Sequence, residues 1–222
     1  MIEIRNLSKE FRVQGVRKQV VRDVNLSVPS RTSVALLGRN GAGKSTLLQM
    51  IAGTMTPTTG EILSDGTISW PVGFAGSFHG ELTGAQNAKF IARIYGVDTE
   101  EMLDFVADFS ELGSNFYLPF RSYSSGMKSR LAFGVSMAIT FDTYLVDEVT
   151  SVGDAAFRKK STDLFLARME TSGAFVVTHS MGMVRQLCDV GVVLEDGVAT
   201  YYDDLEEAIA HHEANMRAVA RK

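Results

Sequence analysis

The chain has 222 residues, of which 26 are acidic and 22 are basic, and its formal net charge is −4. Hydrophobic residues make up 45% and charged residues 22% of the sequence, as in ordinary soluble domains. This composition excludes a disordered chain, a collagen-like repeat and a disulfide scaffold. The length fits one large domain, or one domain that carries a smaller insert.

Charge and hydropathy also limit the partners. A nucleic-acid-binding domain usually has a clear excess of basic residues, so we expect no nucleic acid here and interpret the basic residues from Arg12 to Arg22 as a solvated surface. The single cysteine, Cys188, allows no disulfide within the chain and fits a reducing compartment. The N-terminal residues lack the apolar run of a secretion signal, and no stretch approaches the roughly 20 apolar residues that span a bilayer. We therefore expect a cytoplasmic chain that reaches a membrane only through a partner.

The N-terminal part of the sequence predicts strands and one helix. Residues 2–7 and 20–28 alternate apolar and polar side chains, a pattern typical of half-buried strands. The continuous apolar run 34–37 indicates a strand that is buried on both faces. Glycines follow this run, and residues 44–52 then predict a helix that Gly53 ends.

The remaining sequence is first helical and then alternates again. Residues 84–139 lack strand patterns, and Asp98 with Glu101 predicts the start of a helix within them. Buried strands are then predicted at 143–146, 174–178 and 190–194, and helices at 155–170, 181–187 and 203–220. Strands that alternate with helices indicate an α/β fold with a mainly parallel sheet, so we interpret the helical stretch as an inserted subdomain.

The glycines after the apolar run 34–37 belong to a phosphate-loop pattern, G-x-x-x-x-G-K-[ST], formed by Gly38, Arg39, Asn40, Gly41, Ala42, Gly43, Lys44 and Ser45. Glycines let the backbone approach phosphate oxygens, and the N–H groups at the start of the next helix attract an anion. Lys44 would supply charge to the β- and γ-phosphates, Ser45 a hydroxyl to Mg²⁺, and Thr46 a hydrogen bond to the α-phosphate. The alternative is a glycine-rich turn that binds nothing. The preceding strand and following helix argue against it.

A second acidic element follows the helical stretch. The predicted strand 143–146 leads directly into Asp147 and Glu148. A phosphate-loop NTPase places its magnesium ligand at the carboxyl end of such a strand, so Asp147 is the candidate ligand. Glu148, one residue later, would polarise the water that attacks the γ-phosphate. Two acids at a strand end could also be a solvated turn, but the phosphate loop in the same chain favours the catalytic interpretation.

The segment between these motifs separates the families of phosphate-loop proteins. It contains Tyr123, Ser124, Ser125, Gly126 and Met127, followed by an apolar helix. This run resembles the signature motif of ABC-type ATPases, whose usual form is L-S-G-G-Q. The resemblance continues in chain order: residues 151–154, ending in Asp154, stand where that family has its D-loop, His179 stands at its switch histidine, and Phe11 stands at the aromatic residue that stacks on adenine. Taken alone, His179 or Phe11 would more often be a core residue.

The resemblance implies a fold and a set of site residues. The expected fold is a phosphate-loop α/β core of the ABC type, with an N-terminal antiparallel β subdomain and an inserted helical subdomain that carries the signature. It divides a single nucleotide-binding domain, 1–222, into a β subdomain (1–30), the core (31–83 and 141–202), the helical subdomain (84–140) and a C-terminal helix (203–222). By resemblance, Glu148 and His179 are catalytic. Ser45 and Asp147 hold Mg²⁺, and Ser124, Ser125, Gly126 and Asp154 contact ATP.

Departures from the usual motifs point to one branch of the family. Tyr123, Ser125 and Met127 replace the usual Leu, Gly and Gln of the signature. The Q-loop glutamine has no clear counterpart: Gly76 or Ser77 stands at its place, and Glu81 or a water is left as an alternative. The signature with its following residues, and the run from Phe78 to Gly84, resemble ATP-binding subunits of bacterial polysaccharide exporters. These serve capsular polysaccharide, O-antigen or teichoic acid. Because the sequence ends soon after the switch position, without room for an extra sugar-binding domain, we expect the capsular type.

The family geometry also implies partners. Two copies would pack head to tail, with each ATP between Lys44 of one copy and Ser124 to Gly126 of the other, which gives a homodimer. ATP would favour the closed dimer, because only there do both faces contact the γ-phosphate. The dimer would act on integral membrane permease subunits, and through them indirectly on periplasmic and outer-membrane export components. We therefore expect a peripheral protein on the cytoplasmic face of the inner membrane.

The sequence also leaves two other classes of function open. A soluble ABC-type ATPase that acts on ribosomes or nucleic acid would more often carry two nucleotide-binding units and a less acidic chain. A nucleotide sensor without turnover would fit the altered signature and the missing glutamine. The presence of Lys44, Ser45, Asp147, Glu148 and His179 favours an active ATPase.

Overall fold

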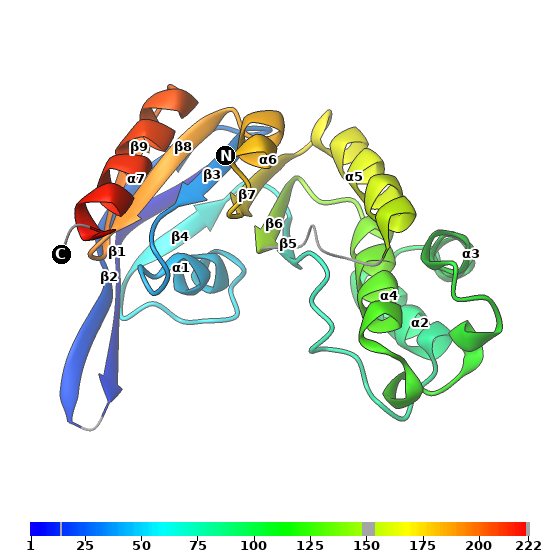
Figure 1. The fold of residues 1–222 in the computed structure, drawn as a ribbon. Helices are drawn as coiled ribbons and strands as arrows, with labels where there is room; N and C mark the ends of the chain where they lie inside the picture. The colour runs from blue at the N-terminus through cyan, green and yellow to red at the C-terminus, as the bar shows by residue number, and fades with distance from the viewer. Residues whose placement is uncertain (14, 148–153, 221–222) are drawn as a thin grey trace. The chain divides into compact units, whose positions relative to one another are not determined.

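The computed structural model describes residues 1–13, 15–147 and 154–220. Contacts divide the chain into two compact units (Figure 1). Unit 1 consists of Met1–Ser69, Phe141–Glu148 and Met169–Lys222, and unit 2 consists of Trp70–Thr140 and Val149–Arg168. The first division between the units falls within a short strand, β5 (Ile68–Pro71).

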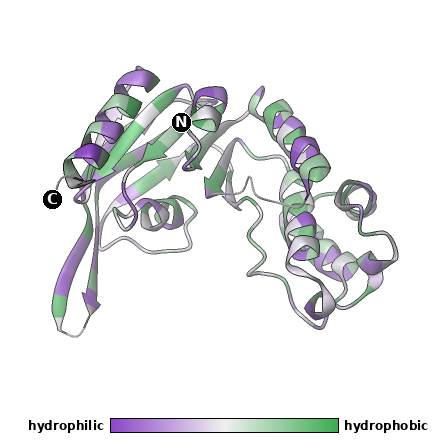
Figure 2. Cartoon of the chain, viewed as in Figure 1, coloured by the Kyte–Doolittle hydropathy of each residue, from purple (hydrophilic) through white to green (hydrophobic). Residues whose placement is uncertain are grey.

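A six-stranded sheet forms the centre of unit 1. Its order is β5-β6-β7-β3-β8-β9, with β6 at Thr143–Asp147, β7 at Gly173–Val177, β3 at Ser33–Leu37, β8 at Val190–Glu195 and β9 at Val198–Tyr202. Strands β6, β7, β3 and β8 are parallel, and β9 pairs antiparallel with β8. Every residue of β3 and β7 is buried, as expected for strands covered on both faces. Figure 2 shows the same hydrophobic character along β8.

A second, antiparallel sheet contains the N-terminal strands. Its order is β2-β1-β4, with β2 at Val16–Val28, β1 at Ile2–Val13 and β4 at Thr59–Ser64. The inward residues of this sheet, such as Leu7 and Val24, belong to the same buried cluster as Leu36 of β3 and Leu194 of β8. The two sheets of unit 1 therefore share one hydrophobic core.

Among its described residues, unit 1 also has three helices (Figure 1): α1 (Lys44–Ile51), α6 (Met181–Leu187) and α7 (Leu205–Ala220). Helix α7 packs against β8 and β3. At Gly191 of β8 the approach is so close that an added Cβ atom would lie 2.2 Å from the Cβ of Ala208. Glycine is therefore required at this crossing because a side chain would push the helix away from the sheet.

Unit 2 is helical. It contains α2 (Gly84–Tyr95), α3 (Thr99–Ser110), the short helices η1 (Gly113–Tyr117) and η2 (Phe120–Ser122), α4 (Ser125–Ala138) and α5 (Ala155–Met169). The Asp98 side chain caps α3 by accepting the Glu101 N–H, as the sequence predicts. Stacked rings of Phe109 and Phe133, with Phe157 edge-on to Phe109, hold α3, α4 and α5 together.

The predicted helices and buried strands are confirmed to within a few residues. The two N-terminal strands are longer than predicted, because β1 continues to Val13 beyond the predicted end at residue 7 and β2 begins at Val16 before the predicted start at residue 20. Three further strands were not predicted. These are β4, β5 and β9. Strand β4 is mostly exposed and β5 has only four residues, so neither has a continuous apolar run or a long alternation.

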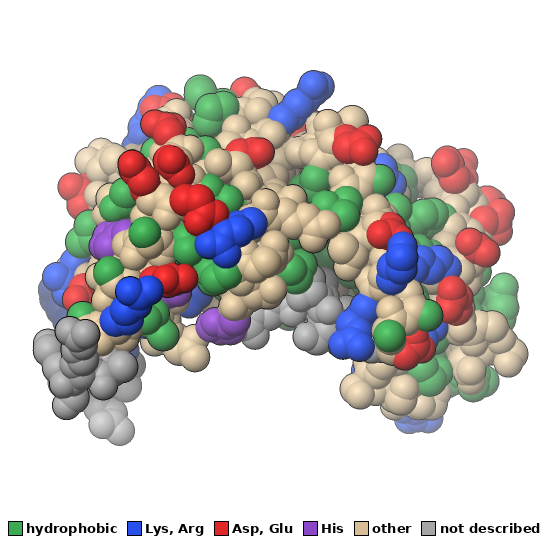
Figure 3. All heavy atoms as spheres, turned by 45° about the horizontal axis from the view of Figure 1, so that its top comes forward, with side chains coloured by type: hydrophobic (Ala, Val, Ile, Leu, Met, Phe, Trp, Pro, Cys, Tyr) green, Lys and Arg blue, Asp and Glu red, His purple; other side chains and the backbone are tan. Residues whose placement is uncertain are grey.

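Acidic and basic side chains are interspersed over the visible face of the structure (Figure 3). In the described part of the chain, no helix has the length and apolar character needed to cross a bilayer.

Candidate functional site

The phosphate loop joins β3 to α1 in a shape that requires glycine. Gly38 has φ 154° and Gly43 has φ 105°. A Cβ on Gly38 would lie 2.3 Å from the Leu194 carbonyl oxygen, and one on Gly43 would lie 2.8 Å from Val20 Cγ1. The loop is thus packed tightly between the end of β8 and strand β2, and its backbone path has no room for larger residues.

Lys44 currently closes the loop on itself. Its Nζ atom donates hydrogen bonds to the carbonyl oxygens of Gly38, at 2.6 Å, and Arg39, at 3.0 Å. The N–H of Ala42 donates to the same Arg39 carbonyl at 3.1 Å. No side chain caps the start of α1, where Gly43 is the N-cap residue. The positive end of this helix therefore faces the region beside the loop.

The loop and the acidic strand share one cavity. It has a volume of about 620 Å³, and its lining residues are Val20, Asn40, Gly41, Gly43, Lys44, Ser45, Thr46, Asp147 and Val177. Asp147 ends β6 and pairs with Val177 at the end of β7, which brings the carboxylate to the same sheet edge as the loop. This is the carboxyl edge of the parallel strands, where open α/β sheets bind ligands. Gly38, Arg39 and Ala42 belong to the loop but do not line this cavity.

Oxygen atoms in this cavity suit a small divalent cation. The Ser45 hydroxyl and the Asp147 carboxylate both line it. Mg²⁺ usually takes one or two protein oxygens and completes its octahedron with phosphate and water. The described residues include no cluster of three or more His, Cys, Asp or Glu that could hold a metal by themselves. The donor set therefore fits Mg²⁺ bound together with a phosphate ligand.

The other three predicted residues of unit 1 are Glu148, His179 and Phe11. Glu148 lies outside the described residues, as do residues 151–153 before Asp154. His179 is exposed and follows the end of β7 by two residues, so it too lies at the carboxyl edge of the sheet. Phe11 lies in β1 with the Lys9 Nζ atom 5.3 Å from its ring centre, and it does not line the cavity.

The predicted signature begins helix α4 of unit 2. Ser124 is the N-cap residue, and its hydroxyl accepts the Met127 N–H at 3.3 Å. Ser124 and Ser125 are exposed, and nothing lies within 4 Å of a Cβ placed on Gly126. A second cavity, of about 540 Å³, is lined by Glu111, Leu112, Asn115, Ser124, Gly126, Met127, Arg130 and Asp154. Three signature residues, Ser124, Gly126 and Met127, are therefore brought together with Asp154.

Tyr123, an unusual residue for this motif, holds the start of the signature in place through its buried side chain. Its side chain is only 4% exposed, and its hydroxyl donates to the Asn115 carbonyl at 2.7 Å. Burial raises the pKa of this phenol. A Cβ on Gly84 would lie 2.3 Å from the hydroxyl oxygen, so the ring fits only because α2 begins with glycine. The larger side chain is thus accommodated without displacing Ser124.

A charge network around the second cavity was not predicted from sequence. Arg130 Nη2 lies 2.7 Å from Asp154 Oδ2, and its Nη1 lies 3.3 Å from Glu111 Oε2. Lys160 Nζ lies 2.8 Å from the other oxygen of Glu111. The pKa of Asp154 is lowered, first by the hydrogen bond from the Phe157 N–H and then by Arg130. The pKa of Glu111 is lowered mainly by Lys160. The partners are far apart in sequence, so no local pattern indicates them.

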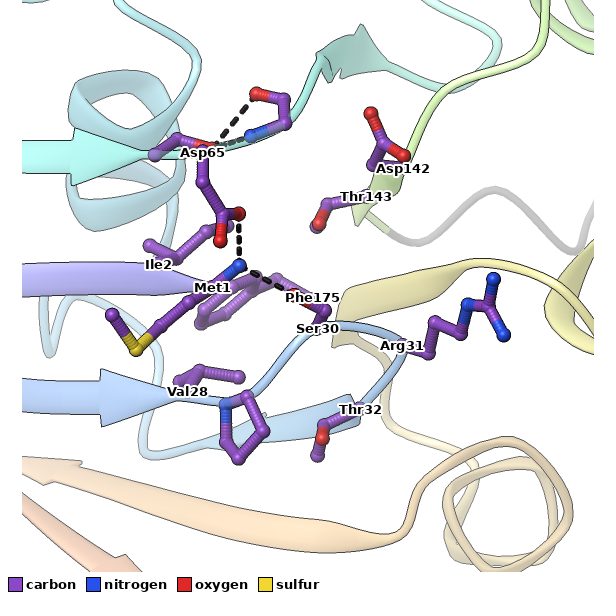
Figure 4. A pocket seen from close by; sticks show the side chains of 13 residues that line it. Met1, Ile2, Val28, Ser30, Arg31, Thr32, Asp65, Asp142, Thr143 and Phe175 are labelled. Carbon is purple, nitrogen blue, oxygen red and sulfur yellow. Dashed lines mark hydrogen bonds and ion pairs between the residues drawn. The ribbon is translucent and has the colours of Figure 1, made fainter.

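Unit 1 also contains a smaller polar cavity of about 290 Å³ at the other end of the sheet (Figure 4). The Met1 amino group lies against Asp65 and donates to the Ser30 hydroxyl at 2.6 Å. Thr32, the residue before β3, and Thr143, the first residue of β6, also line it. Because it lies at the amino ends of the parallel strands, it is not where this type of sheet binds its ligand.

Comparison with known proteins agrees with this geometry. The sequence model of the ABC transporter family matches residues 21–151. The chain belongs to the ABC transporter family. It is 49% identical over 212 residues to the polysialic acid transport ATP-binding protein KpsT of Escherichia coli, covering 94% of this chain and 95% of that protein. It is 43% identical to the capsule polysaccharide export ATP-binding protein CtrD of Neisseria meningitidis serogroup B, covering 96% of this chain and 98% of the relative.

Solved structures of this ABC family share the fold at low identity. The dimeric ATP-binding cassette MJ0796, solved in a post-hydrolysis state with ADP and Pi, aligns with a TM-score of 0.77. The two sequences are 22% identical, and the alignment covers 92% of this chain and 99% of the cassette. The antiparallel sheet, the mixed sheet and the helical unit therefore form an ABC cassette.

Proposed function

We propose that this ABC family member is the ATP-hydrolysing motor subunit of a bacterial transporter that exports capsular polysaccharide across the inner membrane. The observation that carries the ATPase is the single cavity shared by Lys44, Ser45 and Asp147 at the carboxyl edge of the sheet. The substrate class is supported by relatives of 43–49% identity that are described as capsule polysaccharide export and polysialic acid transport proteins. We assign the whole chain, 1–222, to one nucleotide-binding domain.

The cavity residues divide the work of binding ATP. The backbone N–H groups of the loop and the start of α1 bind the phosphates, and Lys44 exchanges its carbonyl partners for β- and γ-phosphate oxygens. Thr46 reaches the α-phosphate. Ser45 and Asp147 hold Mg²⁺, which when bound neutralises charge on the β- and γ-phosphates. Phe11 stacks on adenine.

Two residues would act on the attacking water. Glu148 accepts a proton from it and orients it toward the γ-phosphate. His179, exposed at the same sheet edge as Asp147, donates a hydrogen bond to the γ-phosphate and helps to hold the water. Positioned groups of this kind contribute about 10²–10⁴-fold to the rate.

The signature would act on the ATP of a second copy. The exposed N-terminus of α4, with Ser124, Ser125 and Gly126, offers hydroxyls and N–H groups to a γ-phosphate, and Asp154 lines the adjoining cavity. The two copies would pack head to tail, and the dimeric state of a cassette with the same fold supports a homodimer. The dimer would bind integral permease subunits from the cytoplasmic face of the membrane, and act indirectly on periplasmic and outer-membrane components.

ATP hydrolysis by the purified chain tests the catalytic part. The wild type should release phosphate. The Glu148→Gln variant should bind ATP with Mg²⁺ without hydrolysing it, and should accumulate as an ATP-bound dimer that light scattering detects. Glu206→Gln, which removes an exposed carboxylate from α7, is the matched control and should behave like the wild type. Binding of ATP without turnover by the wild type, alone and with its co-expressed permease, would favour a nucleotide sensor.

Genetic complementation tests the substrate. The host is an Escherichia coli strain that lacks its polysialic acid transport ATP-binding protein. In this strain the chain is expressed together with the permease of the chain's own transporter, and it should restore surface polysaccharide. The Lys44→Ala variant should not. Surface O-antigen or teichoic acid that depends on this chain, with capsule unaffected, would contradict the capsular assignment.

A further inference from the structure

The Arg39 side chain does not line the nucleotide cavity. Its Nη2 atom lies 2.5 Å from Glu195 Oε1, at the end of β8, and 3.4 Å from Asp196 Oδ1. Arg39 and Glu195 are 33% and 24% exposed, whereas Asp196 is 81% exposed. The pair with Glu195 is therefore the stronger interaction, because solvent screens the contact with Asp196.

The same strand end also holds the loop backbone. Gly38 lies against the carbonyl of Leu194, the residue before Glu195. Arg39 is thus held in two ways. Gly38, the residue before it, packs against Leu194 of β8, and the Arg39 side chain pairs with Glu195, the next residue of that strand. Its carbonyl oxygen in turn accepts hydrogen bonds from Lys44 Nζ and the Ala42 N–H. A contact at Glu195 therefore reaches Lys44 through a single residue.

Part of this region is buried, and His212 of helix α7 lies near it. Buried atoms of Arg39 (Nε), Glu195 (Oε2) and His212 (Nδ1) have no hydrogen-bond partner among the described residues. Burial lowers the pKa of His212, the charge of Lys44 lowers it further, and Glu195 acts in the opposite direction. His212 of α7 thus lies within electrostatic reach of both Lys44 and Glu195. In such surroundings an ion pair is screened less than at an open surface.

We propose that Glu195 is a positioning residue for phosphate binding, acting through Arg39 on the backbone of the phosphate loop. When phosphates bind, Lys44 leaves the carbonyls of Gly38 and Arg39, and the loop loses two internal hydrogen bonds. The Arg39–Glu195 pair then keeps the loop in its binding shape. This inference rests on the proposed function, because it assumes that the cavity binds ATP.

A double-mutant cycle tests this inference. Glu195→Gln keeps the side-chain size and Arg39→Gln gives a shorter neutral side chain; each removes the ion pair, and the double variant removes both charges. Equilibrium binding of Mg·ATP and Mg·ADP, thermal midpoints, and KM and kcat are measured for each. Glu206→Gln, which breaks the exposed Arg185–Glu206 pair of the same unit, is the matched control.

Each single variant should weaken binding of both nucleotides about three- to tenfold, the size expected for a partly buried ion pair. KM should rise while kcat changes less than twofold. The affinity of the double variant for nucleotide should be no lower than that of the single variant with the lower affinity. Fully multiplicative effects, or unchanged affinities with a lower thermal midpoint, would overturn the inference. A wild type that binds no nucleotide would instead overturn the proposed function.

Discussion

Arg130 of α4 and Asp154 are joined by a 2.7 Å ion pair, so the helix that begins with the signature serines is tied directly to the residue before α5. Asp154 also accepts the Phe157 N–H at 3.0 Å and thereby caps α5. The Arg130 guanidinium lies 4.4 Å from the centre of the Phe157 ring. One arginine therefore links the two elements of unit 2 that carry predicted ATP contacts.

Replacing Arg130 should destabilise the chain. Arg130→Ala removes the ion pair with Asp154 and the stacking on Phe157, and should lower the free energy of unfolding by about 1–2 kcal/mol. Arg130→Lys keeps the charge but loses the planar stacking on Phe157, so its free energy of unfolding should lie between those of Arg130→Ala and the wild type. Arg217→Ala, whose ion pair within α7 is largely exposed, is the control and should change stability little. Urea unfolding measures all three, and equal stability of Arg130→Ala and the wild type would contradict this role.

The Tyr123 hydroxyl should contribute to the stability of the fold. Tyr123→Phe leaves the buried Asn115 carbonyl without its partner and should cost about 1 kcal/mol of stability. Tyr123→Leu restores the usual residue of the motif but leaves empty space beside Gly84, so it should cost more, about 2 kcal/mol or above. Chemical denaturation of the two variants gives the order. If Leu were the better replacement, the anchoring role of the ring would be wrong.

Gly43 should tolerate no side chain. Gly43→Ala places a Cβ against Val20 at φ 105°, and should cost about 1–3 kcal/mol and weaken ATP binding more than tenfold. Gly182→Ala is the matched control: it lies in helix α6, where nothing is closer than 3.9 Å, and should leave binding unchanged and stabilise the helix slightly. Thermal unfolding and nucleotide titration of both variants test this, and normal binding by Gly43→Ala would be inconsistent with the loop geometry.

Asp142 should contribute to acid sensitivity. Its carboxylate accepts hydrogen bonds from the Thr67 N–H, at 2.7 Å, and the Thr67 hydroxyl, at 2.8 Å, which lower its pKa below the ordinary value of 3.8. A carboxyl whose pKa is lowered by folding stabilises the fold above its unfolded pKa, and this stability is lost as the pH falls through the folded value. Asp142→Asn should therefore be less stable than the wild type at pH 7, and the difference should shrink below about pH 4. Thermal midpoints from pH 7 to 3 measure this, and a constant difference would contradict it.

Local chemistry explains which features could be predicted from the sequence. The phosphate loop and the capped start of α3 are defined by neighbouring residues, so their patterns are visible in the sequence. Strand β9 could not be predicted in this way, because it owes its place to pairing with β8 rather than to a strong apolar pattern of its own. The Arg39–Glu195 and Arg130–Asp154 pairs join residues distant in sequence, and only the fold brings them together.

The close crossing of α7 over β8 limits how far the chain can be shortened. Ala208 and Ile209 are 0% and 2% exposed, so removing this helix would uncover an apolar strip along β8 where Gly191 offers no side chain to cover it. Such a strip, on the sheet that also supports the phosphate loop, is a site for self-association. A truncated chain would therefore be prone to aggregate, even with every residue of the nucleotide cavity intact.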